Sequence, residues 1–361
     1  MPKVNLRQLS LFSPDSQRPF NAPFPSTRYQ GSKRQLAEWI WENVAHLPFE
    51  SVLDVFGGTS VVSHLFKNAG KRVIYNDYLI FNQTIAHALI ENTGEIVPSK
   101  VLDELLLTSS EISAPTFIQD TFGNIYFTDD ENRWLDQISH TIRQSSLSQF
   151  QKSIVWFGLF QACIAKRPYN LFHRANLYMR TAKLARSFGN KTTWDTPFET
   201  HMRAFIKEAN AAVFDNGRHN QALHLDALET PQGLDLVYLD PPYLNAKGVG
   251  VNYRDFYHFL EGLMLGEAWH NAIDYGSKHR RLIPQKSPWD SPSTIVKSFQ
   301  QVIDYHAQSI LVISYRDDGF PSVDDLIRVL KQHKKRVQVH TLPKKYVLSN
   351  RESHEVLLVA E

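Results

Sequence analysis

The stretch Leu234-Asp235-Leu236-Val237-Tyr238-Leu239-Asp240-Pro241-Pro242-Tyr243 decides how the rest of the sequence is interpreted. Its first six residues are mostly apolar and β-prone, which predicts a buried strand. Neither of the two prolines that follow has an N–H group with which to continue a strand ladder. In an open α/β sheet, ligands bind beyond the carboxyl ends of the strands. We therefore expect residues 240–243 to face a ligand.

Residues 240–243 offer carbonyl oxygens, one carboxylate and one aromatic ring. These acceptors can take the hydrogens of an amino group on a planar base, and the ring of Tyr243 can stack on the face of that base. The alternative is a strand that ends in a Pro-Pro turn, with Asp240 as an ordinary turn residue. The motifs elsewhere in the chain favour the ligand site.

Length and composition indicate a large folded protein of two or three lobes, with 361 residues and 42% hydrophobic content. The formal net charge is only +2, so binding to nucleic acid depends on where the charges lie. The single cysteine, Cys163, excludes intramolecular disulfides, fits a reducing cytoplasm and lies in an apolar run typical of a core. The sequence has no clustered histidines, no apolar run of roughly 18 residues and no signal-peptide core. It therefore predicts a cytoplasmic protein without a metal site.

Two glycine-containing turns precede the 234–243 stretch. Residues 28–36 predict a turn that opens a helix, with Ser32 as its N-cap. A helix start exposes N–H groups that favour anions, and Lys33 adds positive charge there. Residues 51–62 predict a strand, a turn at Gly57-Gly58 and a helix, and the glycines let the backbone approach a ligand closely. The alternative for residues 28–36 is a plain helix cap, and a Gly-Gly pair after a strand is by itself a weak signal.

Two acidic residues follow other predicted strands. Residues 72–76 predict a strand that leads into Asp77, roughly 20 residues beyond the glycines. An acid at this place can accept hydrogen bonds from both ribose hydroxyls of a nucleoside cofactor. Asp77 can equally cap the helix that follows, or serve in both roles. Asp226 can meet the adenine ring of a cofactor or simply cap a turn.

The distribution of these patterns predicts three parts of the chain. Residues 1–26 are polar and proline-rich, which predicts an extended N-terminal arm. Residues 27–100 and 211–361 carry the α/β pattern and predict the catalytic domain. Residues 101–210 are mainly helical and predict an inserted domain. Within the catalytic part, the loop-rich residues 244–300 have no predicted role.

The second half of the helical insert is basic, with aromatic and Asn residues interleaved. Arg and Lys fit phosphates, whereas Asn and aromatic groups can read base edges or fill the gap left by an extruded base. The alternative is a solvated basic face. We expect DNA contacts here and in the basic connector near the C-terminus, from Lys166, Arg167, Tyr169, Asn170, Phe172, Arg174, Arg180, Lys344, Lys345 and Arg351.

Taken in their order along the chain, the motifs resemble those of the DNA adenine methylases that act on the exocyclic amino group. The resemblance rests on residues 28–33, 54–58, 76–77 and 240–243, and residues 346–351 resemble the last hairpin of that family. An insertion between the two halves resembles the subgroup with an internal target-recognition domain. The glycine spacing departs slightly from the usual pattern of the family.

The resemblance implies an α/β fold: a Rossmann-like S-adenosylmethionine-dependent methyltransferase sheet with an inserted, mainly helical DNA-recognition domain. It also implies site-specific methyl transfer to N6 of adenine in double-stranded DNA after base flipping. The catalytic residues would be Asp240, Pro241, Pro242 and Tyr243. The residues lining the cofactor pocket would be Tyr29, Gly31, Lys33, Asp54, Phe56, Gly57, Gly58, Thr59, Asp77, Tyr78 and Asp226.

Other functions remain open at this point. A cytosine-N4 methyltransferase would share the fold, but that family usually has Ser before Pro-Pro-Tyr, so Asp240 favours adenine. Methylation of RNA or of a protein glutamine uses the same core, commonly with Asn in place of the Asp. A catalytically inactive DNA-binding relative would not need the intact Asp77, Asp240 and Tyr243.

Two protein partners are candidates for a bacterial or phage methylase of this kind. One is a cognate restriction endonuclease. The other is the replication sliding clamp, because Gln8-Leu9-Ser10-Leu11-Phe12 resembles the short clamp-binding peptide of clamp partners. A mobile polar arm has no reason to expose Leu9, Leu11 and Phe12 unless they pack somewhere. The alternative is that the peptide folds back on its own catalytic domain.

Overall fold

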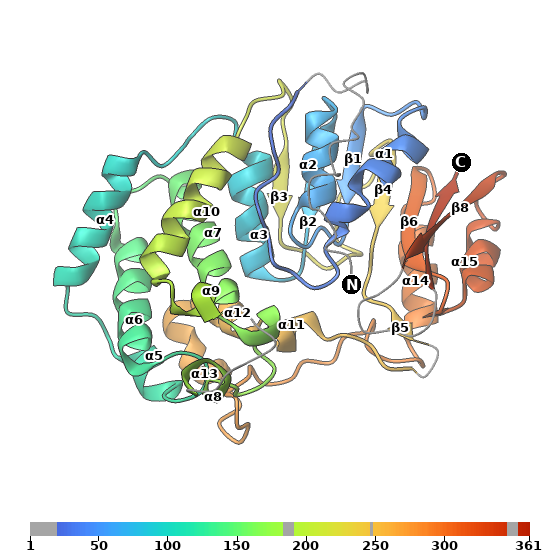
Figure 1. Cartoon of the computed structure of the whole chain (residues 1–361). Helices are drawn as coiled ribbons and strands as arrows, with labels where there is room; N and C mark the ends of the chain where they lie inside the picture. Colours follow the sequence, from blue (N-terminus) through green and yellow to red (C-terminus); the bar gives the residue numbers. More distant parts are fainter. Residues whose placement is uncertain (1–19, 183–190, 246–247, 345–352) are drawn as a thin grey trace, which may run out of the picture.

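The computed structural model describes residues 20–182, 191–245, 248–344 and 353–361. These residues form an α/β core and a helical lobe beside it (Figure 1). The last part of the predicted arm, residues 20–26, packs on the core, since the Phe20 N–H donates to the Asn68 carbonyl at 3.3 Å. Outside the described residues lie Gln8, Leu9, Leu11, Phe12, Lys345 and Arg351.

Seven strands form the central sheet, in the order β3-β2-β1-β4-β6-β9-β8. β9 pairs antiparallel with both of its neighbours, whereas the other neighbouring pairs run parallel. A two-stranded ribbon joins β5 to β7. The strands are β1 (Ser51–Asp54), β2 (Arg72–Asn76), β3 (Gln221–Leu223), β4 (Leu236–Leu239), β5 (Leu244–Asn245), β6 (Ile310–Arg316), β7 (Gly319–Phe320), β8 (Val337–Lys344) and β9 (Ser353–Ala360).

Helices cover both faces of the sheet, and the strands alternate accordingly. Val52 and Val73 point into one apolar cluster, whereas their neighbours Leu53 and Ile74 point into another. A strand buried on both faces reads as a continuous apolar run, as the sequence predicted for β4. The first face is covered by η1 (Lys33–Gln35), α1 (Ala37–Val44), α2 (Val61–Asn68) and α3 (Ile80–Ala86), and the second by α14 (Ile295–Tyr305) and α15 (Val323–Leu330).

The order in which strands are added to the sheet reverses between β1 and β4, although the two strands run parallel. From β1 the chain moves outward through β2 to β3, and it then returns to β4 on the other side of β1. Leu53 on β1 pairs with Ile74 on β2 and with Val237 on β4. The carboxyl ends of two parallel strands that separate in this way leave a crevice between them. The glycine turn after β1 and residues 240–243 after β4 therefore meet at one edge of the sheet.

The helical lobe lies beside β3 and is built mainly between β2 and β3 (Figure 1). Its apolar core is continuous with the core on one face of the sheet, so it does not have a separate hydrophobic centre. The boundaries that the sequence predicted for this insert stay a prediction. Its helices are η2 (His87–Glu91), α4 (Ser99–Glu111), α5 (Phe117–Thr121), α6 (Asp129–Gln144), α7 (Gln149–Ala165), η3 (Pro168–Asn170), α8 (Tyr178–Thr181), α9 (Lys191–Asp195) and α10 (Phe198–Ala212).

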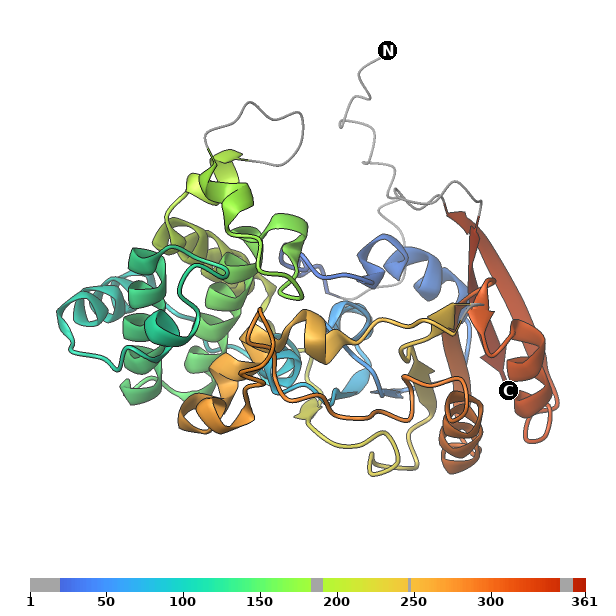
Figure 2. The same cartoon turned by 90° about the horizontal axis from the view of Figure 1, so that it is seen from below.

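A second segment joins the helical lobe, from the region for which the sequence predicted no role. Figure 2 shows it passing from the sheet to the lobe and back. Its Trp269 packs against Phe122 and Phe259, with ring centroids 5.1 and 5.3 Å away. The helices of this segment are α11 (Tyr253–Phe256), α12 (His258–Leu265), η4 (Gly266–Ala268) and α13 (Trp269–Ala272). Across the described ranges, no helix combines the length and the apolar character that a membrane crossing requires.

Candidate active site

A cavity of about 250 Å³ lies where the carboxyl ends of β1, β2 and β4 meet. Further walls come from the turn before η1, the loop after β3, and the segments 251–254 and 285–290. The cavity is lined by every residue for which the sequence predicted a catalytic or cofactor-binding role: Tyr29, Gly31, Lys33, Asp54, Phe56, Gly57, Gly58, Thr59, Asp77, Tyr78, Asp226, Asp240, Pro241, Pro242 and Tyr243.

An ion pair joins the two halves of the cavity. The Nζ atom of Lys33 lies 2.7 Å from Oδ1 of Asp240, and the two side chains are only 10% and 17% exposed. Burial alone would lower the pKa of Lys33, but Asp240 together with Tyr238, Tyr243 and Glu355 more than offsets it. The pKa of Lys33 therefore lies well above its usual value. Lys33 therefore stays charged and fixes the position of Asp240.

Two glycines of the site are required by the packing around them. A Cβ atom on Gly57 would lie 2.1 Å from the ring of Tyr75, which fills the space beneath the turn. Gly31 has a φ of +80°, and a Cβ there would lie 2.6 Å from the Tyr253 hydroxyl. The close approach of the backbone to its neighbours thus explains the glycine at each position.

Asp77 braces the glycine turn. Its Oδ2 accepts a hydrogen bond from the Gly58 N–H at 2.9 Å, and its Oδ1 accepts one from the Leu79 N–H at 2.8 Å. The second bond closes a turn just before α3, whose N-cap residue is Leu79, so Asp77 is not itself the helix cap that the sequence left open. Burial raises the pKa of Asp77, although these hydrogen bonds oppose the rise.

Asn76 is a structural residue of the site that sequence reasoning missed. Its Nδ2 donates to the carbonyls of Val55 at 3.0 Å and Leu225 at 3.2 Å, and its Oδ1 accepts from the Leu225 N–H at 2.9 Å. These bonds draw the loop that carries Asp226 towards the end of β1. Asp226 itself caps a turn, since its Oδ1 accepts from the Leu228 N–H at 2.9 Å.

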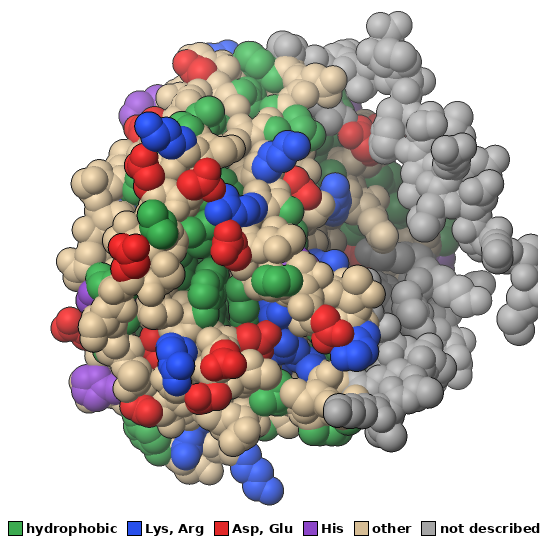
Figure 3. Space-filling view, turned by 60° about the vertical axis from the view of Figure 1, so that its left-hand side comes forward, with side chains coloured by type: hydrophobic (Ala, Val, Ile, Leu, Met, Phe, Trp, Pro, Cys, Tyr) green, Lys and Arg blue, Asp and Glu red, His purple; other side chains and the backbone are tan. Residues whose placement is uncertain are grey.

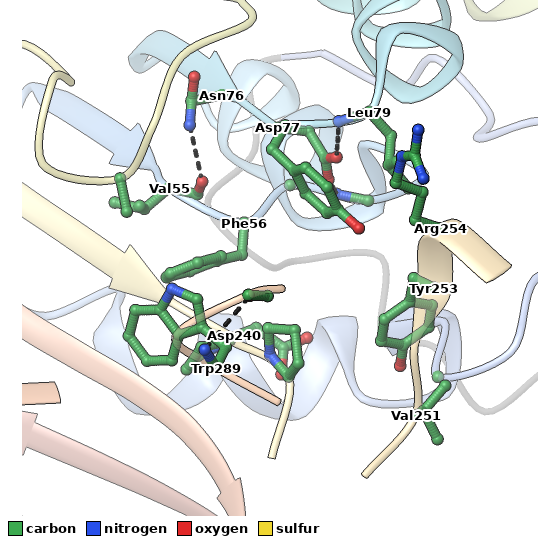
Figure 4. A pocket seen from close by; sticks show the side chains of 18 of the residues that line it. Val55, Phe56, Asn76, Asp77, Leu79, Asp240, Val251, Tyr253, Arg254 and Trp289 are labelled. Atoms are coloured by element: carbon green, nitrogen blue, oxygen red, sulfur yellow. Dashed lines mark hydrogen bonds between the residues drawn. The ribbon is translucent and has the colours of Figure 1, made fainter. Parts of the chain in front are cut away.

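Aromatic rings form opposite walls of the cavity (Figure 4). Phe56 meets Trp289 edge to face at 5.0 Å, and Tyr253 and Arg254 stand across from them. The sequence did not assign Trp289 or Tyr253, because they follow no strand and belong to no motif. A signal was nevertheless present, since aromatic residues are concentrated in an otherwise polar segment. Tyr243 packs against Tyr315 at 5.6 Å.

Asp54 offers an unpaired acceptor to the cavity that it lines. Its Oδ2 accepts from the Ser63 hydroxyl at 2.7 Å, whereas its buried Oδ1 has no hydrogen-bond partner among the described residues. Burial raises the pKa of Asp54 to about 7. A buried acceptor without a partner is costly, so a ligand with a donor or a positive charge would be favoured here.

Comparison with known proteins identifies the family. A family model described as D12 class N6 adenine-specific DNA methyltransferase matches residues 29–279. The chain belongs to this family. Its sheet is the methyltransferase fold expected from the sequence, and its activity is methyl transfer to N6 of adenine in DNA, not the cytosine-N4 alternative.

Several relatives of this methyltransferase carry matching names. The type II methyltransferase M2.HphI of Haemophilus parahaemolyticus is 28% identical over 348 residues, which cover 93% of this chain and 96% of that protein. The type II methyltransferase M.NlaIII of Neisseria lactamica is 23% identical over 87% of this chain and 90% of its own length. The modification methylase StsI of Streptococcus sanguinis is 24% identical over 91% of this chain but only 51% of its own length.

The residues of the cavity fit S-adenosylmethionine, the methyl donor that the family implies. Phe56 and Trp289 form an aromatic wall for a flat base. The Asp77 carboxylate stands beside the glycine turn, where it can accept from ribose hydroxyls. The unpaired Oδ1 of Asp54 suits the positively charged amino-acid end of the cofactor. Among the described residues, no group of three or more His, Cys, Asp or Glu side chains is arranged to hold a metal ion.

Four residues predicted to contact DNA lie inside the helical lobe, and the prediction is corrected for them. Hydrogen bonds explain the burial of the three basic residues, and packing against Tyr126 and Phe259 explains that of Phe172. Lys166 donates to the carbonyls of Trp194 and Thr196 and pairs with Glu131 at 2.9 Å. A run of basic residues in the sequence does not show which of them satisfy carbonyl groups in the interior. The four buried residues are Lys166, Arg167, Phe172 and Arg180.

Arg167 organises the loop that follows α7. Its guanidinium donates to the carbonyls of Leu171 at 3.2 Å and Arg174 at 2.9 Å, and to the side chain of Asn176. The loop thereby turns its exposed residues outward. The side chain of Tyr169 is 65% exposed, Arg174 is exposed and Asn170 is partly exposed. Their contacts with DNA stay a prediction. Lys344 ends β8, and its side chain is not described.

The outer face of the helical lobe carries mixed charges. Figure 3 shows Lys and Arg side chains interspersed with Asp and Glu over this side of the molecule. One example is Arg203, which pairs with Glu199 at 2.8 Å. Such a face lacks the single-sign field that attracts DNA. The exposed loop after α7 is therefore a better candidate for DNA contact than the lobe surface as a whole.

Replacing Arg167 and Arg174 separately by Met should give different results. Loss of Arg167 leaves several buried carbonyls unpaired, so we expect the free energy of unfolding to fall by about 3 kcal/mol. Loss of the exposed Arg174 should change stability by less than about 0.5 kcal/mol. It should instead weaken DNA binding and reduce the salt slope of log K by about 1. Denaturant titration and fluorescence anisotropy measure the two effects. An equal loss of stability in both variants would contradict the assignment.

Asp54 should make stability depend on pH. Because its folded pKa of about 7 lies above the usual 3.8, the folded protein retains a proton that the unfolded chain has lost between these values. The contribution of Asp54 to the free energy of unfolding is therefore complete below about pH 4 and is lost as pH rises through 7. Asp54→Asn keeps the hydrogen bond with Ser63 and should flatten this decline. Denaturant titrations at pH 5 and pH 7 give the free energy of unfolding of both proteins. If it fell by the same amount between these pH values in the wild type and in Asp54→Asn, the pKa of Asp54 would not be raised.

Proposed function

We propose that this methyltransferase binds an adenine that has swung out of the DNA duplex and holds its amino group with Asp240 and Pro241. The observation that carries the proposal is the ion pair of Asp240 with Lys33, which fixes a carboxylate in the cavity that the glycine turn also lines. An amino group inside a duplex cannot reach such a cavity, so the base must leave the helix.

The residues around Asp240 supply the conditions that the chemistry needs. The amino lone pair of adenine is delocalised into the ring, which makes the nitrogen a poor nucleophile. When the Asp240 carboxylate and the Pro241 carbonyl accept its two hydrogens, the nitrogen moves towards tetrahedral geometry and its lone pair is freed. The ring of Tyr243 would stack on the base and hold it in place.

The cofactor would occupy the part of the cavity below the glycine turn. S-adenosylmethionine supplies a sulfonium methyl group that is already activated for transfer. Asp77 would bind the ribose, Asp54 the charged amino-acid end, and Phe56 with Trp289 the adenine ring. We further propose that the reaction requires no metal ion, because the residues need only bind and align the two reactants.

The exposed loop after α7 would contact double-stranded DNA. Tyr169 and Asn170 both have left-handed backbone conformations, with φ of 62° and 59°. Non-glycine residues in this region are strained, and such strain is common at functional sites. Because Arg167 holds the loop backbone from inside, Tyr169 is presented on the outside of the loop. Tyr169 and Arg174 are the residues we expect to meet the duplex.

The relatives favour a role in restriction and modification. Two of them are named type II methyltransferases, and a third is named a modification methylase. We infer that this enzyme protects DNA from a cognate restriction endonuclease in the cytoplasm of a bacterium or of a phage-infected cell. Digestion of DNA from expressing cells with a panel of nucleases would identify the protected sequence.

Replacing Asp240 tests the proposed chemistry. In Asp240→Ala, transfer of labelled methyl groups to DNA should fall by at least about a thousand-fold, since the acceptor for the amino hydrogens is lost. DNA affinity should change little, because it comes mostly from phosphate contacts. Lys33→Ala is the matched variant, which keeps the Asp240 carboxylate but removes the lysine that holds it, and we expect a smaller loss. Normal turnover in Asp240→Ala would show that the amino group is held elsewhere.

Asp77→Ala tests the ribose site. The variant loses the acceptor for the Gly58 N–H of the glycine turn, the acceptor for the Leu79 N–H and the proposed ribose contact. S-adenosylmethionine should therefore bind at least about ten-fold more weakly. Calorimetry measures the affinity, and circular dichroism checks that the protein is folded. Asp226→Ala is a useful comparison, because Asp226 lines the same cavity from an exposed turn. An Asp77 variant with wild-type affinity would remove this residue from the cofactor site.

Binding of the N-terminal arm to the replication clamp would deliver the methyltransferase to newly made DNA. We propose that Gln8, Leu9, Leu11 and Phe12 dock into a groove of the sliding clamp, since leucine and aromatic anchors suit such a groove. Purified clamp should be retained by the wild-type protein and not by a Leu11→Ala, Phe12→Ala double variant. Equal retention of clamp by both proteins, or by neither, would leave the fold-back of the arm as the better explanation.

A further inference from the structure

Tyr253 occupies a fixed place in the wall of the cavity. It begins α11, and Figure 4 shows its side chain on the opposite side of the cavity from Phe56 and Trp289. Its ring is parallel to that of Tyr29, with an interplanar angle of 4° and centroids 5.6 Å apart. Tyr29 stacks in turn on Tyr257 at 4.5 Å. Three stacked rings thus prevent Tyr253 from turning freely.

The hydroxyl of Tyr253 is near Lys33 and Asp240, since Tyr253 interacts electrostatically with both. It lies directly over Gly31, where a Cβ atom would come within 2.6 Å of it. Gly31 is two residues from Lys33, which holds Asp240. Burial raises the pKa of Tyr253, and Lys33 only partly opposes the rise, so the hydroxyl keeps its proton at neutral pH. It is therefore a hydrogen-bond donor close to the catalytic carboxylate.

This hydroxyl has no hydrogen-bond partner in the part of the chain that the structure describes. A partly buried donor without a partner is unfavourable, so the site favours a ligand with an acceptor. The Tyr257 hydroxyl, by contrast, accepts from the Gln30 N–H at 2.8 Å. The two tyrosines of the stack thus differ: one hydroxyl holds the protein together and the other is open to a ligand.

Short connections hold α11 at both ends. The Asn252 side chain accepts from the Asp255 N–H at 2.8 Å and caps the helix. At the other end, the Phe256 carbonyl accepts from the Phe172 N–H at 2.9 Å, in the loop after α7. Tyr253 is therefore linked through a single helical turn to the loop proposed to contact DNA. Its position over Gly31 is set before any base arrives.

We propose that the Tyr253 hydroxyl donates a hydrogen bond to a ring nitrogen of the extruded adenine, N1 or N7, beside the amino group held by Asp240. This inference rests on the proposed function of the site. Both ring nitrogens flank the amino group and both are acceptors. With the two amino hydrogens taken by Asp240 and Pro241, a donor is the group still needed to hold the base edge.

The test is a cycle that removes the hydroxyl and the nitrogen separately and together. Values of kcat/KM are measured for the wild type and Tyr253→Phe on duplexes that carry adenine, 1-deazaadenine or 7-deazaadenine at the target position, after methylation-aware sequencing has found that position. Tyr253→Phe keeps the stacked ring and should fold normally. Tyr275→Phe, at a 52% exposed position outside the cavity, is the matched control.

Tyr253→Phe should lower kcat/KM on adenine about ten-fold, as expected for one hydrogen bond. One of the two analogues should lower the wild-type value similarly and cause no further loss in the variant. Tyr275→Phe should behave as wild type on all three duplexes. Losses that multiply for both analogues would overturn the proposal. The proposal would also be overturned if Tyr253→Phe bound S-adenosylmethionine more weakly while its kcat/KM relative to wild type was the same on all three duplexes. That result would assign the hydroxyl to the cofactor. A wild type that transfers no methyl group to adenine would instead contradict the proposed function itself.

Discussion

The ion pair between Lys33 and Asp240 is the interaction on which the site depends. It joins the turn before η1 to the end of β4 across a distance of 2.7 Å, and both side chains are largely shielded from water. Removal of either partner would deprive a largely buried charge of this ion pair, which is unfavourable. Because β1 pairs with β4, the same contact fixes Asp240 relative to the glycine turn. The Asp240 carboxylate, to which we assign the catalytic role, is thus in place before DNA or cofactor binds, which is the preorganisation that positional catalysis requires.

The sequence predicted the parts of the site that follow strands. β2 has the bounds predicted for it, and Asp77 and Asp240 meet because the carboxyl ends of parallel strands share one edge of the sheet. Tyr253 and Trp289 could not be predicted in this way. They lie in a loop-rich segment, and their positions depend on packing against Tyr29 and Phe56, which are distant in sequence. A pattern within a short window carries no information about such contacts.

The DNA-contact residues show a second limit of sequence reasoning. Arg167 and Arg174 look alike in the sequence, but the first holds a loop from inside and the second is exposed. A guanidinium has several donors and can satisfy the carbonyls of a tight loop, so a basic residue beside aromatic residues is not by itself a DNA contact. The continuous core and the bond from Phe172 to Phe256 likewise tie the helical lobe to the catalytic part. The helical lobe and the rest of the molecule therefore share one hydrophobic core, which the sequence pattern of an inserted domain does not show.

A structure of the enzyme with its cognate duplex and S-adenosylhomocysteine would test the central claim most directly. The measured quantities are the distances from N6 of the target adenine to the Asp240 carboxylate and to the Pro241 carbonyl. The account predicts an adenine outside the helix, stacked on Tyr243, with both distances near the roughly 2.9 Å of a hydrogen bond. An adenine that stays in the helix, or an N6 that meets neither acceptor while Lys33 still pairs with Asp240, would contradict it.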